Sequence, residues 1–153
     1  MIDNLPTPND FQSESKKSGD HFEELVYADL IIRGFTNIKK NVYVDGAGCE
    51  VDFFADYKEY VEAKGGFDGD NKRPGAKRTD SVKKAIANGA LIKAVKPDAY
   101  YVVYFSSKPF EKSYSNEMIN TALKHNIIDE VRYIENQKQK LFETLFADWQ
   151  WDD

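Results

Sequence analysis

The chain has 153 residues, of which 41% are hydrophobic and 31% charged, a composition typical of one globular domain with a substantial core. The formal net charge of −5 argues against nucleic acid as a partner, although the distribution of charge matters more than its sum. A single cysteine, Cys49, with two histidines excludes a disulfide framework and a zinc site of the usual kind, and the absence of a long apolar run or secretory signal predicts a cytoplasmic protein without membrane contact.

The N-terminal part is predicted to hold an arm and one helix. Residues 1–17 are polar and without periodicity, which indicates a flexible arm. A helix should follow, capped by Ser18 or Asp20 and stopped at Gly34. Its buried stripe is predicted from the helical spacing of Phe22, Leu25, Val26, Leu30 and Ile32.

Three strands are predicted next, at residues 38–44, 49–54 and 59–64, with the last two joined as a hairpin by the polar turn ADYKE. A loop dense in glycine, proline and charge then leads to a helix that begins near Thr79 or Asp80 as its cap. The remaining segments are predicted as strand, helix, strand and helix, and they comprise residues 98–107, 114–126, 127–134 and 137–146.

This order of elements predicts the α/β class. The first three strands should form a meander, and the helical crossover before residues 98–107 requires that strand to run parallel to one of them. We therefore expect a central mixed β-sheet flanked by helices. A single domain at residues 18–147 should contain it, followed by an acidic aromatic tail at residues 148–153.

Basic residues are concentrated in one segment of the chain. Between Lys64 and Lys96 there are nine Lys or Arg residues and three Asp residues, so this segment carries +6 and the rest of the chain −11. Such polarity predicts one basic face. A solvated helix within a surface of mixed charge explains the same pattern equally well.

The stretch EVDFFADYKEYVEAKGG, residues 50–66, places charged residues inside an apolar hairpin. Strand alternation puts Val51, Phe53, Val61 and Ala63 on one face and the charged residues on the other. A tight hairpin then brings three of these together, and they are Asp52, Glu62 and Lys64.

Two neighbouring carboxylates repel each other unless a cation lies between them. A hard divalent cation such as Mg²⁺ resolves that conflict, since it binds carboxylates, carbonyl oxygens and water. Lys64 beside the pair could hold or deprotonate a water, or stabilise charge on a phosphate. The alternative is an ordinary exposed hairpin face, although Gly65 and Gly66 directly after the lysine favour a site kept free of side chains.

These residues resemble the metal-binding core of the PD-(D/E)XK nuclease superfamily, as found in archaeal Holliday-junction resolvases and restriction endonucleases. The resemblance covers residues 18 to about 106, and Val51 stands where the family name has proline. It implies a restriction-endonuclease-like fold and a Mg²⁺-dependent endonuclease that hydrolyses DNA, with Mn²⁺ able to substitute. It further implies catalytic roles for Asp52, Glu62 and Lys64. The implied metal ligands are the two carboxylates, the carbonyl of Ala63, and Glu23 with Glu24 in reserve.

The basic segment fits DNA as the partner, because phosphate contacts position a duplex without reading its sequence. The candidates for these contacts are Lys72, Arg73, Lys77, Arg78, Lys83 and Lys84. For each of them a solvated surface position is the alternative.

A different class of function stays open, a non-catalytic module that binds DNA or a protein partner and retains the nuclease fold. The basic segment and the acidic aromatic tail both suit it. A homodimer would be the simplest way to cut both strands, and the tail could dock on a partner protein.

Overall fold

The computed structural model describes residues 21–66 and 75–135. It begins with a helix at residues 21–32. The elements that follow are β1 (Ile38–Val44), β2 (Cys49–Ala55), β3 (Glu59–Lys64), the short 3-10 helix η1 (Gly75–Lys77), α2 (Thr79–Val95), β4 (Tyr100–Phe105), α3 (Tyr114–Lys124) and β5 (Glu130–Tyr133).

The five strands form one mixed sheet in the order β1-β2-β3-β4-β5. β1, β2 and β3 pair antiparallel, whereas β4 pairs parallel with β3 and β5 pairs parallel with β4. The predicted meander and the predicted crossover are therefore both confirmed. α2 is the crossover between β3 and β4, and α3 is the crossover between β4 and β5.

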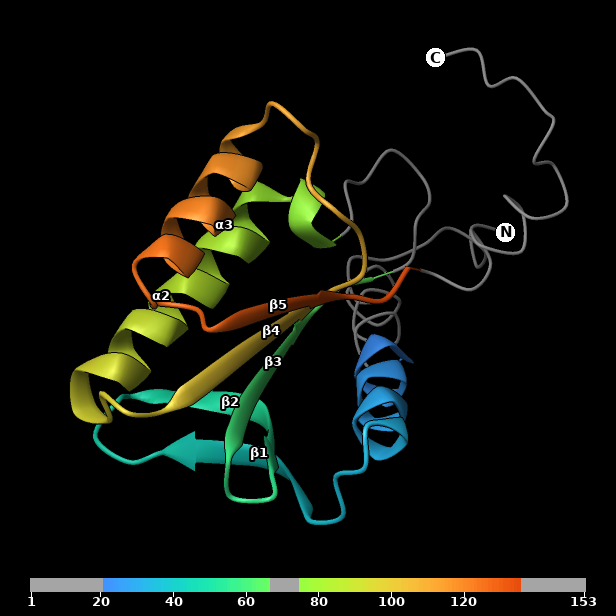
Figure 1. Cartoon of the computed structure of the whole chain (residues 1–153), viewed down its shortest axis with the longest axis vertical. Coiled ribbons are helices and arrows are strands. Elements are labelled where there is room, and N and C mark those ends of the chain that lie inside the picture. The colour runs from blue at the N-terminus through green and yellow to red at the C-terminus, as the bar shows by residue number, and fades with distance from the viewer. Residues whose placement is uncertain (1–20, 67–74, 136–153) are drawn as a thin grey trace, which may run out of the picture.

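Helices cover both faces of the sheet (Figure 1). α2 and α3 cover one face, where Val82, Ile92 and Ile119 pack in a cluster with buried residues of the sheet. The helix at residues 21–32 covers the other face, where Val26 and Leu30 pack in a second cluster. β4 is buried on both faces because it lies between these layers, so the strand is an apolar run without alternation.

Local chemistry explains most of the element ends. Gly34 has a φ of +99° and ends the first helix, as the sequence predicts. Asp56 and Tyr57, both at positive φ, make the tight turn between β2 and β3. α2 begins at Thr79, but the residue that precedes it as N-cap is Arg78, which makes no side-chain capping bond, so the expected cap at Thr79 or Asp80 is wrong.

Two expectations about the core are also wrong. Ile32 is 83% exposed, because it lies two residues after the buried Leu30 and therefore on the opposite side of the helix. Val51 does not share a cluster with Phe53 and Val61; it packs under α2 and α3 instead. β2 pairs with β3 only from Phe53 onward, so the part of β2 that includes Val51 pairs with β1 alone and can bend toward the other layer.

Several expectations fall outside the described residues: the arm, the cap at Ser18 or Asp20, the C-terminal helix and the tail. In the part of the chain that the structure describes, no helix combines the length and the apolar character that a bilayer crossing requires.

Candidate active site

Asp52 lies where β2 and β3 separate. The ladder between these strands pairs Phe53 with Val61 and ends there. Two residues farther along β3, the amide of Ala63 donates a hydrogen bond of 2.7 Å to Oδ2 of Asp52. The carboxylate thus takes the place of a backbone acceptor, and this bond fixes it beside β3.

Glu62, next to Val61 on β3, is only 4% exposed. Its Oε2 accepts a hydrogen bond of 2.9 Å from Nδ2 of Asn88 on α2. Burial, a hydrogen bond with Asp52 and the Asp52 charge together raise the pKa of Glu62 from 4.5 to about 8, although Lys64 and Asn88 act in the opposite direction. The folded protein therefore favours the protonated form of Glu62 more strongly than solvent does.

Lys64 is the third member of the set. Its Nζ lies 3.9 Å from Oε1 of Glu62, and its side chain is 25% exposed. The lysine ends β3, and its side chain is more exposed than that of Glu62. The structure therefore places a cation beside the buried Glu62 and the partly buried Asp52.

The backbone after Lys64 is tightly enclosed. A Cβ at Gly65 would lie 2.6 Å from the ring of Phe22 and 2.6 Å from Cβ of Ser106. The glycine therefore lets the helix at residues 21–32 and the end of β4 both approach the end of β3. This explains the first of the two glycines by close packing rather than by a turn.

The charges of Asp52 and Glu62 also affect the pKa values of neighbouring side chains. Burial and the charge of Glu62 raise the pKa of the Cys49 thiol. Burial, with the charges of Glu62, Cys49 and Asp52, raises the pKa of Tyr101 well above its ordinary value. Its hydroxyl donates to the carbonyl of Ala85 on α2 at 2.8 Å. Cys49 is therefore a protonated thiol and not an activated nucleophile.

The predicted third carboxylate, Glu23, lies on the helix at residues 21–32 and is partly buried. Within the described residues no three His, Cys, Asp or Glu side chains are grouped as a metal site requires, so Glu23 forms no such group with Asp52 and Glu62. The metal roles of Glu23 and of the Ala63 carbonyl stay predictions.

A short series of backbone hydrogen bonds connects the end of β3 to η1, which contains Lys77. The amide of Ser106 donates to the carbonyl of Lys64 at 3.3 Å, and the amide of Ala76 donates to the carbonyl of Ser107 at 3.2 Å. η1 is thereby held at the end of β4, next to the end of β3. Lys77 is the last residue of η1, and Arg78 follows it directly.

The predicted DNA contacts differ in their surroundings. Arg78 and Lys84 are exposed, whereas Nζ of Lys77 lies 5.2 Å from the centroid of the Phe110 ring. Lys83 is exposed beside α3. Lys72 and Arg73 lie outside the described residues.

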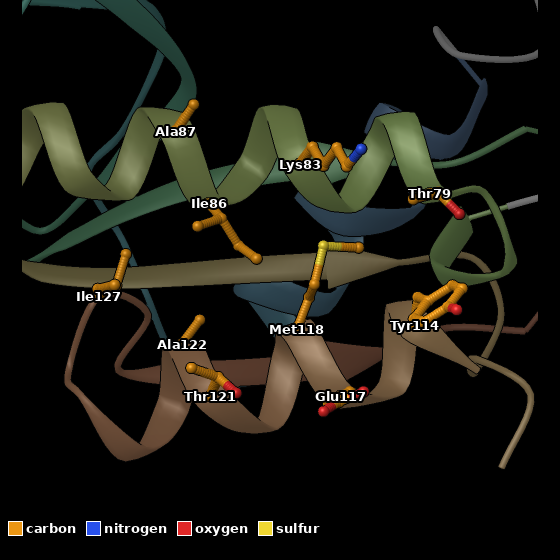
Figure 2. A pocket seen from close by; sticks show the side chains of 10 residues that line it. All are labelled: Thr79, Lys83, Ile86, Ala87, Tyr114, Glu117, Met118, Thr121, Ala122 and Ile127. Atoms are coloured by element: carbon orange, nitrogen blue, oxygen red, sulfur yellow. The ribbon is translucent and has the colours of Figure 1, made fainter. Parts of the chain in front are cut away.

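Lys83 lies at the edge of a groove between α2 and α3 with a volume of about 690 Å³ (Figure 2). Ile86 of α2 and Met118 of α3 extend toward each other across it (Figure 2). None of Asp52, Glu62 and Lys64 lines this groove. It belongs to the helical layer and not to the acid pair.

Asn88 is the site residue that the sequence prediction missed. It lies on the side of α2 that also holds Ala85 and Ile92, both of which are buried. An amide at helical spacing within an apolar stripe requires a polar partner, because an unsatisfied buried amide is costly. That spacing was the available signal, and Glu62 is the partner.

Comparison with protein families, with curated proteins and with solved structures finds no match for this chain.

Proposed function

We propose that the protein is a metal-dependent deoxyribonuclease with a restriction-endonuclease-like fold, and that it hydrolyses internal phosphodiester bonds of DNA. One observation carries the proposal. Asp52 and Glu62 are held together in a largely buried position, and this raises the pKa of Glu62 to about 8. Strongly shifted carboxyls with a specific charged neighbour are concentrated at functional sites.

The donor set fits a divalent cation of the hard class. Mg²⁺ is usually bound by one or two carboxylates and keeps several waters, so Asp52 and Glu62 suffice, with the Ala63 carbonyl and Glu23 as further candidates. A bound Mg²⁺ or Mn²⁺ would supply Lewis-acid stabilisation of phosphate charge and lower the pKa of a bound water. Because the ion and the proton compete for the same oxygens, its affinity should rise with pH.

The protein's own groups divide the remaining tasks. Lys64 lies at the solvent-accessible end of β3, where its ammonium can orient a water or stabilise charge on the phosphate. Asn88 orients Glu62 through the bond to Oε2. The exposed basic residues, Arg78 and Lys84 among them, can neutralise flanking phosphates.

The decisive experiment incubates the full chain with linear, circular and branched DNA, in Mg²⁺ or in chelator. The proposal expects cleavage with Mg²⁺ that is lost in Lys64→Ala, by a factor of about 100 or more. Equal cleavage by the variant would remove Lys64 from the mechanism. If none of the substrates were cut, the activity itself would be refuted.

Metal calorimetry separates this function from the non-catalytic alternative. A binding module that retained only the fold should give no heat with Mn²⁺ that depends on Asp52. The nuclease should give such heat, and Asp52→Asn should abolish it. Lys84→Gln is the matched control, since it removes an exposed charge on α2 and should leave metal binding unchanged.

A further inference from the structure

A second recess lies at the opposite end of β3 from Lys64. It has a volume of about 350 Å³, and its lining includes Tyr60 at the start of β3, Phe54 of β2, Tyr57 of the turn between them, and Tyr100 of β4. This volume is at the lower limit of cavities that hold small ligands. The recess is lined by aromatic rings and lies at the ends of β2, β3 and β4.

Three of these rings form one cluster. The rings of Phe54 and Tyr60 are stacked, with centroids 4.4 Å apart and planes inclined by 21°. The ring of Tyr57 meets Phe54 edge-on at 5.9 Å. Tyr57 is 63% exposed, so it is the ring of this cluster that a ligand can cover without unfolding anything.

The turn that carries Tyr57 is held in place. Oδ1 of Asp56 accepts hydrogen bonds from the amides of Thr36 and Asn37, at 3.1 and 2.6 Å. The amide of Asp56 donates back to the carbonyl of Asn37 at 2.7 Å. The position of the exposed ring is thus set before any ligand arrives, which lowers the entropic cost of binding.

Positive charge surrounds the rings. Lys58 and Lys96 are exposed and contribute to the lining together with one acid, Asp98. Nζ of Lys39 lies 4.4 Å from the centroid of the Tyr57 ring. Two lysines and one carboxylate line the recess, Lys39 adds a third positive charge, and the Glu130 carboxylate at the hydroxyl of Tyr100 is paired with Arg132. This balance favours an anionic ligand, and the exposed ring favours a ligand with a flat aromatic face.

The geometry points to a nucleotide-binding site, in which the base of an unpaired nucleotide stacks on Tyr57 while Lys58 and Lys96 contact its flanking phosphates. Stacking platforms bordered by lysines are how proteins bind single strands irrespective of sequence. The bases of a duplex cannot reach such a platform, because they are stacked on each other. The inference rests on the proposed function and names its substrate form: DNA with an unpaired segment.

The recess and the acid pair can be tested separately. Lys58 and Lys64 are six residues apart, so about 20 Å of extended strand separates them. A change at Tyr57 should therefore leave Asp52 and Glu62 undisturbed. Binding can also be measured in chelator, where the proposed cleavage does not occur.

The experiment measures fluorescence anisotropy of the full chain in EDTA with labelled 12-nucleotide probes. One probe is oligo(dC), the second is an abasic strand of the same length, and the third is the matching duplex. We expect oligo(dC) to bind about 5- to 100-fold more tightly than the abasic strand. Tyr57→Ala should abolish this preference, while Tyr57→Phe keeps it. Tyr114→Ala, which removes a tyrosine 82% exposed on α3, is the control and should also keep it.

Salt dependence gives a second readout that does not require a change in the turn. Lys58→Ala keeps every ring and should reduce the slope of log affinity against log salt by about 0.7. Equal affinity for oligo(dC) and the abasic strand would overturn the inference, as would tighter binding of the duplex. Tighter binding of free dCMP than of the strand would also overturn it and assign the recess to mononucleotides. A folded Tyr57→Ala variant that retains the base preference would refute the role of that ring.

These outcomes differ from those of the cleavage assay. Base-dependent binding without cleavage in Mg²⁺ would keep the nucleotide site and refute the nuclease. Cleavage without base-dependent binding would support the nuclease and refute the nucleotide site.

Discussion

Replacing Glu62 with glutamine should stabilise the protein at neutral and alkaline pH when no divalent cation is present. The folded pKa of this carboxyl, about 8, lies above the ordinary value of 4.5, so folding favours the protonated form. The stabilisation is fully present below pH 4.5 and is lost as pH rises through 8. A glutamine keeps the shape of the protonated acid, because its amide can donate to Asp52 while its oxygen accepts from Asn88.

The size of the effect follows from linkage. Each pH unit between 4.5 and about 8 removes about 1.4 kcal/mol from the wild-type protein, so by pH 7 about 3 kcal/mol is lost and by pH 8 at most about 5 kcal/mol. For a chain of this length 1 kcal/mol corresponds to roughly 2–4 °C in Tm. Glu62→Gln should therefore raise Tm by roughly 10–20 °C at pH 8 and by almost nothing at pH 4.5.

Thermal unfolding in EDTA across pH 4.5 to 9, followed by circular dichroism, measures this directly. Glu111→Gln is the matched control: it removes an exposed carboxylate and should leave the wild-type pH profile unchanged. Adding Mn²⁺ should stabilise the wild-type protein more than Glu62→Gln. The reasoning fails if the variant is no more stable than wild type at pH 8, or if the difference does not shrink toward pH 4.5.

Three further predictions concern the surroundings of the acid pair. Asn88→Ala removes a hydrogen bond that favours ionised Glu62. The pKa of Glu62 should therefore rise further, and the pH profile of cleavage should move to higher pH. An unchanged profile would contradict the role of the Asn88 amide. Gly65→Ala introduces a Cβ 2.6 Å from the ring of Phe22 and should cost about 1–3 kcal/mol in urea-unfolding free energy, and a neutral result would show that the helix can shift. Arg78→Gln should weaken duplex binding and reduce its salt slope by about 0.9 if the arginine contacts a phosphate, whereas a slope equal to that of wild type would place it in solvent.

Sequence patterns predicted the order of the helices and strands because the ends of these elements depend on local residues. Glycine ends the first helix, a polar turn closes the hairpin, and the crossover helix requires a parallel strand. Alternation also placed Glu62 and Lys64 on the face opposite to Val61, which is where the structure has them, with Glu62 directed to α2.

Alternation failed for Val51 because it assumes that a strand remains beside one partner. β2 pairs with β3 only from Phe53 to Ala55, and its preceding residues, which include Val51, pair with β1 alone. The same separation places Asp52 against the amide of Ala63. The depth of Glu62 and its bond to Asn88 could not be predicted either, since both depend on how α2 packs across the sheet.

A second group of acids, Glu59 and Asp29, is partly buried on the face of the sheet opposite to α2, and the contrast with Asp52 and Glu62 favours a ligand at the latter pair. At the start of β3, Glu59 forms an ion pair with Arg132 at 3.0 Å. Asp29, on the helix at residues 21–32, is partly buried, yet hydrogen bonds from Tyr104 and Arg33 hold its pKa below the usual value.

At the end of β3, Glu62 pairs with Lys64 at 3.9 Å, and the pKa of Glu62 is raised. Arginine therefore compensates Glu59 and Asp29. At the other end of β3, Glu62 favours its protonated form beside Asp52. Arginine partners stabilise the ionised forms of Glu59 and Asp29. The absence of an arginine partner from the contacts described for Asp52 and Glu62 gives the protein no stability. The uncompensated pair is explained if a bound divalent cation takes the place of that proton.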